Sequence, residues 1–225
     1  RRQREKAHTP VAAIVGYTNA GKSTLLNRLT DAGILAEDKL FATLDPTTRS
    51  LELDGGQQIL LTDTVGFIRK LPHHLIEAFK STLEEAKYAD LILHVVDCSN
   101  LAMDMQMHVV YETLRELEVG DKIMVTIFNK TDRMTGEEIP RDLRSDYQIR
   151  ISAKTGDGID RLKDLLGQIL RSQKVYMERL FPYSQAGKIQ TIRKYGELLS
   201  EEYEAEGIRV KAYVPAELFA GLMQE

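Results

Sequence analysis

The sequence predicts an α/β fold in which a mostly parallel sheet carries helices on both faces, followed by a small α+β domain at the C-terminal end. Three observations lead to this prediction. Short apolar runs of strand length alternate with longer stretches whose apolar residues fall on one helix face. A glycine-rich loop joins the first run to the first of these stretches. Acidic or amide side chains follow several later runs, as they do where the carboxyl ends of parallel strands form a ligand site.

The first strand, loop and helix are predicted from three adjoining stretches. Pro10–Val15 is a short apolar run typical of a buried parallel strand, and Ser23–Leu29 places three leucines on one helix face. Between them, Gly16–Ser23 reads G-Y-T-N-A-G-K-S and fits the phosphate-binding loop pattern of glycine, four residues and Gly-Lys-Ser. Backbone N–H groups of such a loop and the helix N-terminus bind phosphate. The alternative is a chance glycine-rich turn, which the flanking strand and helix argue against.

Two side chains of this loop have predicted roles. We expect the Lys22 ammonium to reach the β- and γ-phosphates of a nucleotide, and the Ser23 hydroxyl to bind Mg²⁺.

The next informative stretch, Leu40–Ser50, reads L-F-A-T-L-D-P-T-T-R-S and contains a turn signal at Asp45-Pro46. Three threonines in this stretch each offer a hydroxyl to a metal: Thr43, Thr47 and Thr48.

Two further strands are predicted at Leu51–Leu53 and Gln58–Thr62, joined by a hairpin at Gly55-Gly56. The second of them runs into the tetrapeptide D-T-V-G. We expect its first residue, Asp63, to contribute to the Mg²⁺ shell, because acidic residues at this strand end do so in phosphate-binding enzymes. The N–H of Gly66 can approach a γ-phosphate closely. The alternative is a turn without a ligand.

The middle of the chain predicts a helix, a buried strand and a second helix. The helix at His74–Lys87 begins beside two histidines, which we expect to be exposed rather than catalytic. The strand at Leu91–Val96 ends at Asp97 and contains His94, which we expect to be packed and hydrogen-bonded. Three methionines follow in the second helix and are interpreted as packing and surface residues: Met103, Met105 and Met107.

A candidate base-reading loop follows the apolar strand Ile123–Phe128 and reads N-K-T-D. A carboxylate at Asp132 accepts hydrogen bonds from N1–H and the 2-amino group of guanine, and adenine lacks this pair of donors. The Asn129 amide would serve the base edge and tie the loop to the phosphate-binding loop, and the Lys130 stem would cover the base. The sequence therefore predicts selection of guanine over adenine.

The last strand of the sheet is predicted at Ile149–Ile151, and it ends at Ser152-Ala153-Lys154, where a backbone N–H can meet guanine O6. A helix with apolar residues from Ile159 to Leu170 then closes the sheet. For the tail, the patterns predict a βαβ-like domain with a short final helix. Its elements are a strand at Lys174–Pro182, a helix with apolar residues from Ile189 to Tyr203, a strand at Gly207–Val214 and a helix at Ala216–Gln224.

Composition limits the class of protein. The 225 residues are 43% hydrophobic and 28% charged, as in globular proteins, and the net charge of −4 gives no overall attraction to nucleic acid. The single cysteine, Cys98, favours a reducing compartment, and no stretch approaches the length of a membrane span. The chain has no initiator methionine and opens with the basic run R-R-Q-R-E-K. We interpret residues 1–9 as the end of an upstream linker or helix; RNA binding by this run is the alternative.

The motifs together resemble those of a known family. G-Y-T-N-A-G-K-S, D-T-V-G-F, N-K-T-D and S-A-K, in this order and each at a strand end, resemble the G motifs of translation-factor-related P-loop GTPases with the Ras-like fold. L-F-A-T-L-D-P-T-T-R and D-T-V-G-F-I-R-K-L-P are similar to the switch regions of the HflX family in the Obg–HflX-like group, which are ribosome-associated GTPases of bacteria. The resemblance covers a GTPase domain at residues 10–172 strongly and a C-terminal domain at residues 173–225 more weakly.

The resemblance implies a site and a function. It assigns the Mg²⁺ ligands to Ser23, Thr43 and, through water, Asp63, and catalysis to Lys22, Thr43 and Gly66. It implies binding of GTP and GDP, hydrolysis of GTP, a cytoplasmic monomer, and the large ribosomal subunit with its RNA as partner. The nucleotide-binding residues that it implies are Gly16, Tyr17, Thr18, Asn19, Ala20, Gly21, Lys22, Ser23, Thr24, Phe41, Ala42, Thr43, Leu44, Asp45, Asp63, Thr64, Val65, Gly66, Asn129, Lys130, Asp132, Ser152, Ala153 and Lys154.

Two residues qualify this implied function. Phe67 stands where Ras-type enzymes place a water-orienting glutamine, which implies slow intrinsic turnover. In several related GTPases an asparagine at the place of Asn19 is a K⁺ ligand. The alternative is that Asn19 only stabilises the loop turn. Three other functions stay open: a GTPase that assists RNA modification or ribosome assembly, a nucleotide-binding module with little turnover, and an RNA-dependent helicase, which the sequence neither shows nor excludes.

Overall fold

The computed structural model describes residues 9–30, 47–64, 66–67, 86–134 and 140–224. The chain divides into two compact units: one comprises Val11–Leu51 and Leu60–Leu162, and the other contains Glu52–Ile59 and Lys163–Glu225. Several predictions lie outside the described residues. They concern the basic run at residues 1–6, the stretch at residues 40–46 with Phe41, Ala42, Thr43, Leu44 and Asp45, then Val65, His73, His74 and the predicted helix up to residue 85.

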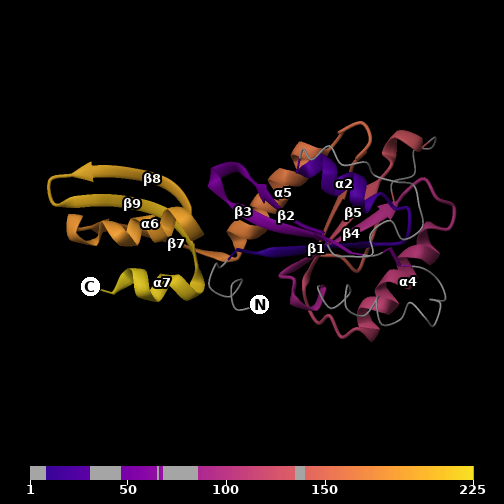
Figure 1. The fold of residues 1–225 in the computed structure, drawn as a ribbon, viewed down its shortest axis with the longest axis horizontal. Coiled ribbons are helices and arrows are strands. Elements are labelled where there is room, and N and C mark those ends of the chain that lie inside the picture. The colour runs from indigo at the N-terminus through magenta and orange to yellow at the C-terminus, as the bar shows by residue number, and fades with distance from the viewer. Residues whose placement is uncertain (1–8, 31–46, 65, 68–85, 135–139, 225) are drawn as a thin grey trace. The chain divides into compact units, whose positions relative to one another are not determined.

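A six-stranded sheet forms the larger unit, with the strand order β2-β3-β1-β4-β5-β6 (Figure 1). β1 pairs in parallel with β3 and β4, and β5 pairs in parallel with β4 and β6, so the predicted parallel sheet is confirmed. β2 begins earlier than the predicted Leu51, because the preceding threonines also favour a strand. The strands are β1 Val11–Gly16, β2 Thr47–Glu52, β3 Gln58–Asp63, β4 Leu91–Asp97, β5 Ile123–Asn129 and β6 Tyr147–Arg150.

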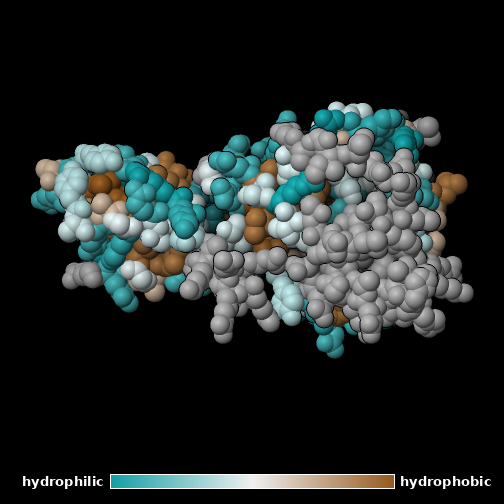
Figure 2. Space-filling view, viewed as in Figure 1, coloured by the Kyte–Doolittle hydropathy of each residue, from teal (hydrophilic) through white to brown (hydrophobic). Residues whose placement is uncertain are grey.

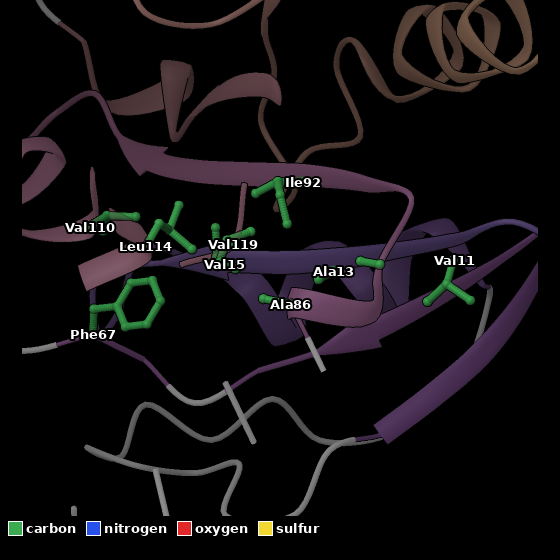
Figure 3. Close-up of a cluster of buried hydrophobic side chains, with 10 residues drawn as sticks. Val11, Ala13, Val15, Phe67, Ala86, Ile92, Val110, Leu114 and Val119 are labelled. Atoms are coloured by element: carbon green, nitrogen blue, oxygen red, sulfur yellow. The ribbon is translucent and has the colours of Figure 1, made fainter. Parts of the chain in front are cut away.

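Helices cover both faces of this sheet, as predicted: α2 (Lys22–Leu29) and α4 (Met103–Glu116) lie on opposite faces in Figure 1. α5 (Ile159–Ser172) follows the last strand. One core cluster packs α4 against β1 and β4 (Figure 3), and its members include Val11, Ala13, Val15, Phe67, Ile92, Val110 and Leu114. Alternate residues of β1 therefore fix the position of the strand from which the glycine-rich loop leaves.

A buried polar network lies on β4, β5 and α4. The Asp142 carboxylate is 5% exposed and accepts hydrogen bonds from Tyr111 Oη and Thr126 Oγ1, both at 2.5 Å. The His94 ring packs edge-on against Tyr111 at 5.4 Å between centroids, which confirms that it is packed. Among the described residues its Nδ1 has no hydrogen-bond partner, so the predicted hydrogen bond is absent there. Burial lowers the pKa of His94 to about 4, so the ring is neutral.

The second unit contains a three-stranded antiparallel sheet with the order β7-β9-β8. The predicted strand is present as β9, and alternate residues of it are buried and pack with α6 in a core of this unit. Figure 2 shows hydrophilic side chains interspersed with apolar ones on the near face of this unit, which is ordinary for a solvated surface. Its elements are β7 Lys174–Phe181, α6 Ala186–Tyr195, β8 Glu197–Glu204, β9 Gly207–Pro215 and α7 Ala216–Met223.

One predicted element of this unit is wrong. The predicted helix through Tyr203 ends at Tyr195, and the remainder is the strand β8, so the order is βαββα instead of βαβ with a short helix. Gly196 ends the helix in an extended conformation. A Cβ atom there would lie 2.7 Å from the Tyr213 carbonyl oxygen, so only glycine fits this position beside β9. None of the helices in the described part of the chain has the length and apolar character needed to cross a bilayer.

Candidate functional site

The glycine-rich loop leaves β1 and enters α2 in a conformation that its glycines permit. Gly21 has φ +100° and Asn19 has φ +60°. A Cβ atom on Gly16 would lie 2.4 Å from the Val95 carbonyl oxygen, and one on Gly21 would lie 2.3 Å from Asn129 Nδ2. The loop can therefore pack against β4 and against the N-K-T-D segment only with glycine at both positions.

The Lys22 ammonium lies inside this loop and makes, among the described residues, only long hydrogen bonds to backbone carbonyls. Its Nζ donates to the carbonyl oxygens of Gly16 at 3.3 Å and Tyr17 at 3.2 Å. The side chain is 7% exposed, and burial lowers its pKa to about 8, although nearby Asp63 opposes this shift. An anion bound in the loop would stabilise the ammonium more strongly than two carbonyls do, as predicted for phosphate.

We expect nucleotide binding to take up a proton at Lys22. Bound phosphate would stabilise the charged ammonium, so binding should raise the pKa of Lys22 from its value of about 8. Affinity for GDP should be constant below that pH and fall by up to about tenfold per pH unit above it. Calorimetry in buffers of different ionisation enthalpy should give proton uptake near zero at about pH 7 and substantial uptake at about pH 8.5. Lys22→Arg, which stays charged, should abolish the uptake, and equal uptake in this variant would place the titrating group elsewhere.

Ser23 and Asp63 meet where a nucleotide metal would bind. The Ser23 hydroxyl, on the first turn of α2, donates to Asp63 Oδ2 at 2.7 Å, and Asp63 is 2% exposed at the end of β3. Hydroxyl and carboxylate oxygens are the donors that Mg²⁺ prefers, so the residues present fit this ion. Of the three candidate threonines, Thr48 places its hydroxyl 3.0 Å from Thr62 Oγ1 on β3, and Thr43 lies outside the described residues.

The D-T-V-G segment lies against the glycine-rich loop. Thr64 uses both its N–H and its Oγ1 to donate to the Ile14 carbonyl, at 3.2 and 2.7 Å, so its side chain secures the turn to β1. A Cβ atom on Gly66 would lie 3.1 Å from Lys22 Nζ and 2.8 Å from Thr18 Cα. Gly66 is thus beside the lysine that is predicted to bind the γ-phosphate, which agrees with its predicted role.

Phe67 is part of the hydrophobic core. Its N–H donates to the Gly16 carbonyl at 3.0 Å, and its carbonyl accepts from Thr18 N–H at 2.8 Å. The ring is 2% exposed and packs in the cluster with Val15 and Val110 (Figure 3). The backbone of Phe67 therefore holds the loop, while its side chain is buried in the hydrophobic core.

Asn129 connects the three loops that the sequence predicts to bind nucleotide. Its Nδ2 donates to the Ala20 carbonyl at 2.9 Å, and its Oδ1 accepts from the Ala153 N–H at 2.9 Å. Asn129 is 2% exposed, so this link is shielded from water. The predicted tie to the phosphate-binding loop is present. Because the Ala153 N–H donates to Asn129, it is not the N–H best placed for guanine O6.

Two neighbours of Asn129 complete the base end of the site. Lys130 Nζ bridges the Asn19 carbonyl and Asp97 Oδ2, both at 2.7 Å. Asp132 is exposed, and its Oδ1 accepts a hydrogen bond from Ser152 Oγ at 2.6 Å. This bond lowers the pKa of Asp132, so the carboxylate is charged and its remaining acceptor sites can meet the N–H donors of guanine.

Three residues in and around the site were missed or given no role by sequence reasoning. Arg28 donates from α2 to the carbonyls of Ala153 at 3.2 Å and Lys154 at 2.7 Å. Asp97 holds Lys130, and its place at the end of a strand was a signal that could have identified it. Arg49 donates to Asn27 Oδ1 at 2.7 Å and so secures β2 to α2.

Comparison with known proteins agrees with this geometry. The sequence profile of the family described as 50S ribosome-binding GTPase matches residues 11–130. A GTPase HflX from Lacrimispora saccharolytica is 76% identical over 222 residues, which are 99% of this chain and 52% of that protein. The chain thus spans about half the length of the curated relatives it matches.

Solved structures show the same fold. A GTP-binding protein from Sulfolobus solfataricus, crystallised in complex with GDP, has a TM-score of 0.56 and 30% identity and covers 74% of this chain and 54% of its own. Aquifex aeolicus Era bound to GDP.AlF4⁻ has a TM-score of 0.59 and 20% identity, covering 96% of this chain and 83% of its own, and this likeness concerns the fold alone. The family profile covers more than half of the chain, including the glycine-rich loop, D-T-V-G and the start of N-K-T-D. The chain therefore belongs to the 50S ribosome-binding GTPase family, within which it is similar to the HflX GTPases.

Proposed function

We propose that this chain is a Mg²⁺-dependent GTP hydrolase whose bound nucleotide switches its conformation. Family membership supports the proposal, and one structural observation carries it. The Asn129 side chain links the Ala20 carbonyl of the phosphate-binding loop to the Ala153 N–H of the predicted guanine loop. A ligand with phosphates in the first loop and a purine at the second matches both ends of this link. Residues 10–172 would form the GTPase domain and residues 173–225 the C-terminal domain.

In this mechanism the residues of the chain position the γ-phosphate for attack by water. Lys22 would exchange its carbonyl partners for β- and γ-phosphate oxygens and stabilise the negative charge that develops on them. The Gly66 N–H, beside Lys22, would donate to the same γ-phosphate. Bound Mg²⁺ supplies electrostatic stabilisation at the phosphate oxygens. Ser23, Thr43 and, through water, Asp63 would hold this ion, with Thr43 assigned by the family resemblance.

The partner that we propose is the large ribosomal subunit, bound in the cytoplasm by a monomer of the full-length protein. Because the Phe67 ring is buried in the core, it gives the attacking water no hydrogen bond, so basal hydrolysis should be slow. Large subunits that order the switch segments should raise the steady-state rate of the full-length protein at least roughly tenfold. The present chain should bind GTP and GDP but respond less.

Steady-state phosphate release with and without purified large subunits tests this proposal, with small subunits as the control. A fast basal rate, or full-length protein that large subunits do not stimulate, would contradict the ribosomal part and leave a GTPase with another partner. A purified chain that binds GTP but never releases phosphate, alone or with subunits, would contradict hydrolysis itself.

We also propose that K⁺ stimulates hydrolysis through Asn19. The residue has φ +60°, and its backbone carbonyl accepts from Lys130 Nζ. Rates in KCl should exceed rates in NaCl severalfold at equal ionic strength, because K⁺ would add positive charge at the phosphates. Asn19→Gly keeps the backbone conformation, removes the side-chain oxygen and should lose the difference. Equal rates of the unsubstituted chain in both salts would leave Asn19 with the role of stabilising the loop turn.

A further inference from the structure

Arg28 spans from the phosphate-binding helix to the loop that follows β6. It lies on α2, whose first residue is Lys22. Its guanidinium donates from Nε to the Ala153 carbonyl at 3.2 Å and from Nη2 to the Lys154 carbonyl at 2.7 Å. The two acceptors are successive carbonyls of the predicted guanine loop, and the planar fork of arginine suits such a pair.

The same loop is held from two other sides. Asn129 Oδ1 accepts from the Ala153 N–H, and Asp132 Oδ1 accepts from Ser152 Oγ. Both partners belong to the N-K-T-D segment, whereas Arg28 belongs to α2. Just beyond these residues Gly156 has φ +93°, and a Cβ atom there would lie 3.7 Å from Arg28 Cζ, so the guanidinium also packs against the turn. The loop is therefore fixed between the N-K-T-D segment and α2.

The Arg28 contact sets the direction of one backbone N–H. In a trans peptide the C=O and the following N–H lie in one plane and point in opposite directions, and no peptide bond described here is cis. Because the Ala153 carbonyl points to Arg28 on α2, the Lys154 N–H points away from α2. The Ala153 N–H is already used by Asn129, so the Lys154 N–H is the donor best suited to meet a guanine O6.

We propose that Arg28 is a positioning residue for guanine recognition, acting by holding the Ala153–Lys154 peptide so that the Lys154 N–H meets O6. This inference rests on the proposed binding of GTP and GDP. It also joins the two ends of the proposed nucleotide site, because one helix carries Lys22 for the phosphates, Ser23 for Mg²⁺ and Arg28 for the base loop. Loss of Arg28 should therefore weaken base recognition more than it weakens the fold.

The test compares GDP with 6-thio-GDP, in which a larger and weaker acceptor replaces O6 and the other base groups are unchanged. Equilibrium dissociation constants are measured for the unsubstituted chain, Arg28→Met and Arg28→Lys. Arg28→Met should lose roughly tenfold in GDP affinity, because two charge-assisted hydrogen bonds at a largely exposed side chain are removed. Its loss for 6-thio-GDP should be severalfold smaller, because a loop that is no longer fixed accepts the larger sulfur. Arg28→Lys, which can hold one carbonyl, should lie between.

The matched control is Arg115→Met, since Arg115 is an exposed helical arginine whose partner is Glu112 on the same helix, and its GDP affinity should be unchanged. If the unsubstituted chain fails to bind GDP, the proposed function fails. If it binds GDP and Arg28→Met loses equally for both nucleotides, or loses nothing, Arg28 has no role in reading O6 and the inference is overturned. Should the methionine variant fail to fold, the ratio of the two affinities in Arg28→Lys decides the question.

Discussion

Asp132→Asn is expected to transfer the preference of this chain from guanine to xanthine nucleotides. In the unsubstituted chain, the carboxylate would accept from N1–H and the 2-amino group of guanine. An asparagine amide turns one acceptor into a donor, which opposes the guanine amino group and suits the oxygen at position 2 of xanthine. The affinity for GDP should fall by about 10³-fold or more, as it does where a buried polar group of a site is left unmatched. The affinity for xanthosine diphosphate should rise correspondingly.

The geometry shows why asparagine is tolerated at this position. Ser152 Oγ donates to Asp132 Oδ1 at 2.6 Å, and the carbonyl oxygen of asparagine can accept the same hydrogen bond. The amide nitrogen then replaces Oδ2 and can donate to the oxygen at position 2 of xanthine, while the second lone pair of Oδ1 remains available for N1–H. Because Asp132 is exposed in the protein without nucleotide, the substitution should leave the free energy of unfolding almost unchanged.

Dissociation constants for GDP, XDP and ADP, measured on both proteins, test this prediction. Asp104→Asn, on the exposed first turn of α4, is the matched control and should keep the preference for guanine. If Asp132→Asn retains the GDP affinity of the unsubstituted chain, Asp132 does not read the base, and the assignment of N-K-T-D is wrong.

The candidate site could be predicted from sequence where it depends on the order of strands. Parallel strands end at one edge, so the residues after β1, β3, β5 and β6 were expected to meet, and the hydrogen bonds of Asn129 and Asp132 agree with this. Arg28 could not be predicted, because an arginine near the end of a helix has the same local pattern whether it contacts water or a distant loop. The hydrogen bond between Thr48 and Thr62 could not be predicted either, because it requires that β2 and β3 lie side by side.

The fold could be predicted where the apolar periodicity and the helix- or strand-breaking residues agree, and it was mispredicted where the two signals conflict. The apolar residues of the tail continue at helical spacing beyond Gly196, yet the chain becomes the strand β8 at Glu197. Pairing with β9 and the close approach of Gly196 to Tyr213 overrule the local pattern there. Tertiary contacts decide such short segments, and a glycine inside a helical pattern is the local sign that they do.

Asn129→Asp is expected to weaken GDP binding by about 10²- to 10³-fold. Asn129 Nδ2 donates to the Ala20 carbonyl at 2.9 Å, and an aspartate oxygen at that place would face the carbonyl oxygen without a proton between them. The side chain is 2% exposed, so the new charge would be buried and close to the phosphates as well. Removing one partner of a buried hydrogen bond costs more free energy than removing one partner of an exposed hydrogen bond.

Asn129→Ala separates the loss of the link from the added charge. It removes the donor to Ala20 and the acceptor for the Ala153 N–H, and leaves both backbone groups without their partner. We expect an intermediate loss of GDP affinity, about tenfold to 10²-fold, because each unsatisfied group costs about 1–3 kcal/mol and water can reach part of the vacated space. The order of GDP affinity should therefore be asparagine, then alanine, then aspartate.

Equilibrium binding of GDP and the shift of the melting temperature on adding GDP measure both effects. Asn100→Asp is the control, because Asn100 is exposed and uses its Oδ1 only as an acceptor for the Ala102 N–H, which aspartate preserves. It should bind GDP like the unsubstituted chain.

If Asn129→Asp also binds GDP normally, the amide does not connect the phosphate and base loops in the working protein. The observation that carries the proposed function would then be lost, even though the chain would remain a member of its family. If the aspartate variant binds GDP better than the alanine variant, the link matters but the charge does not, and the Ala20 carbonyl must turn away from the side chain.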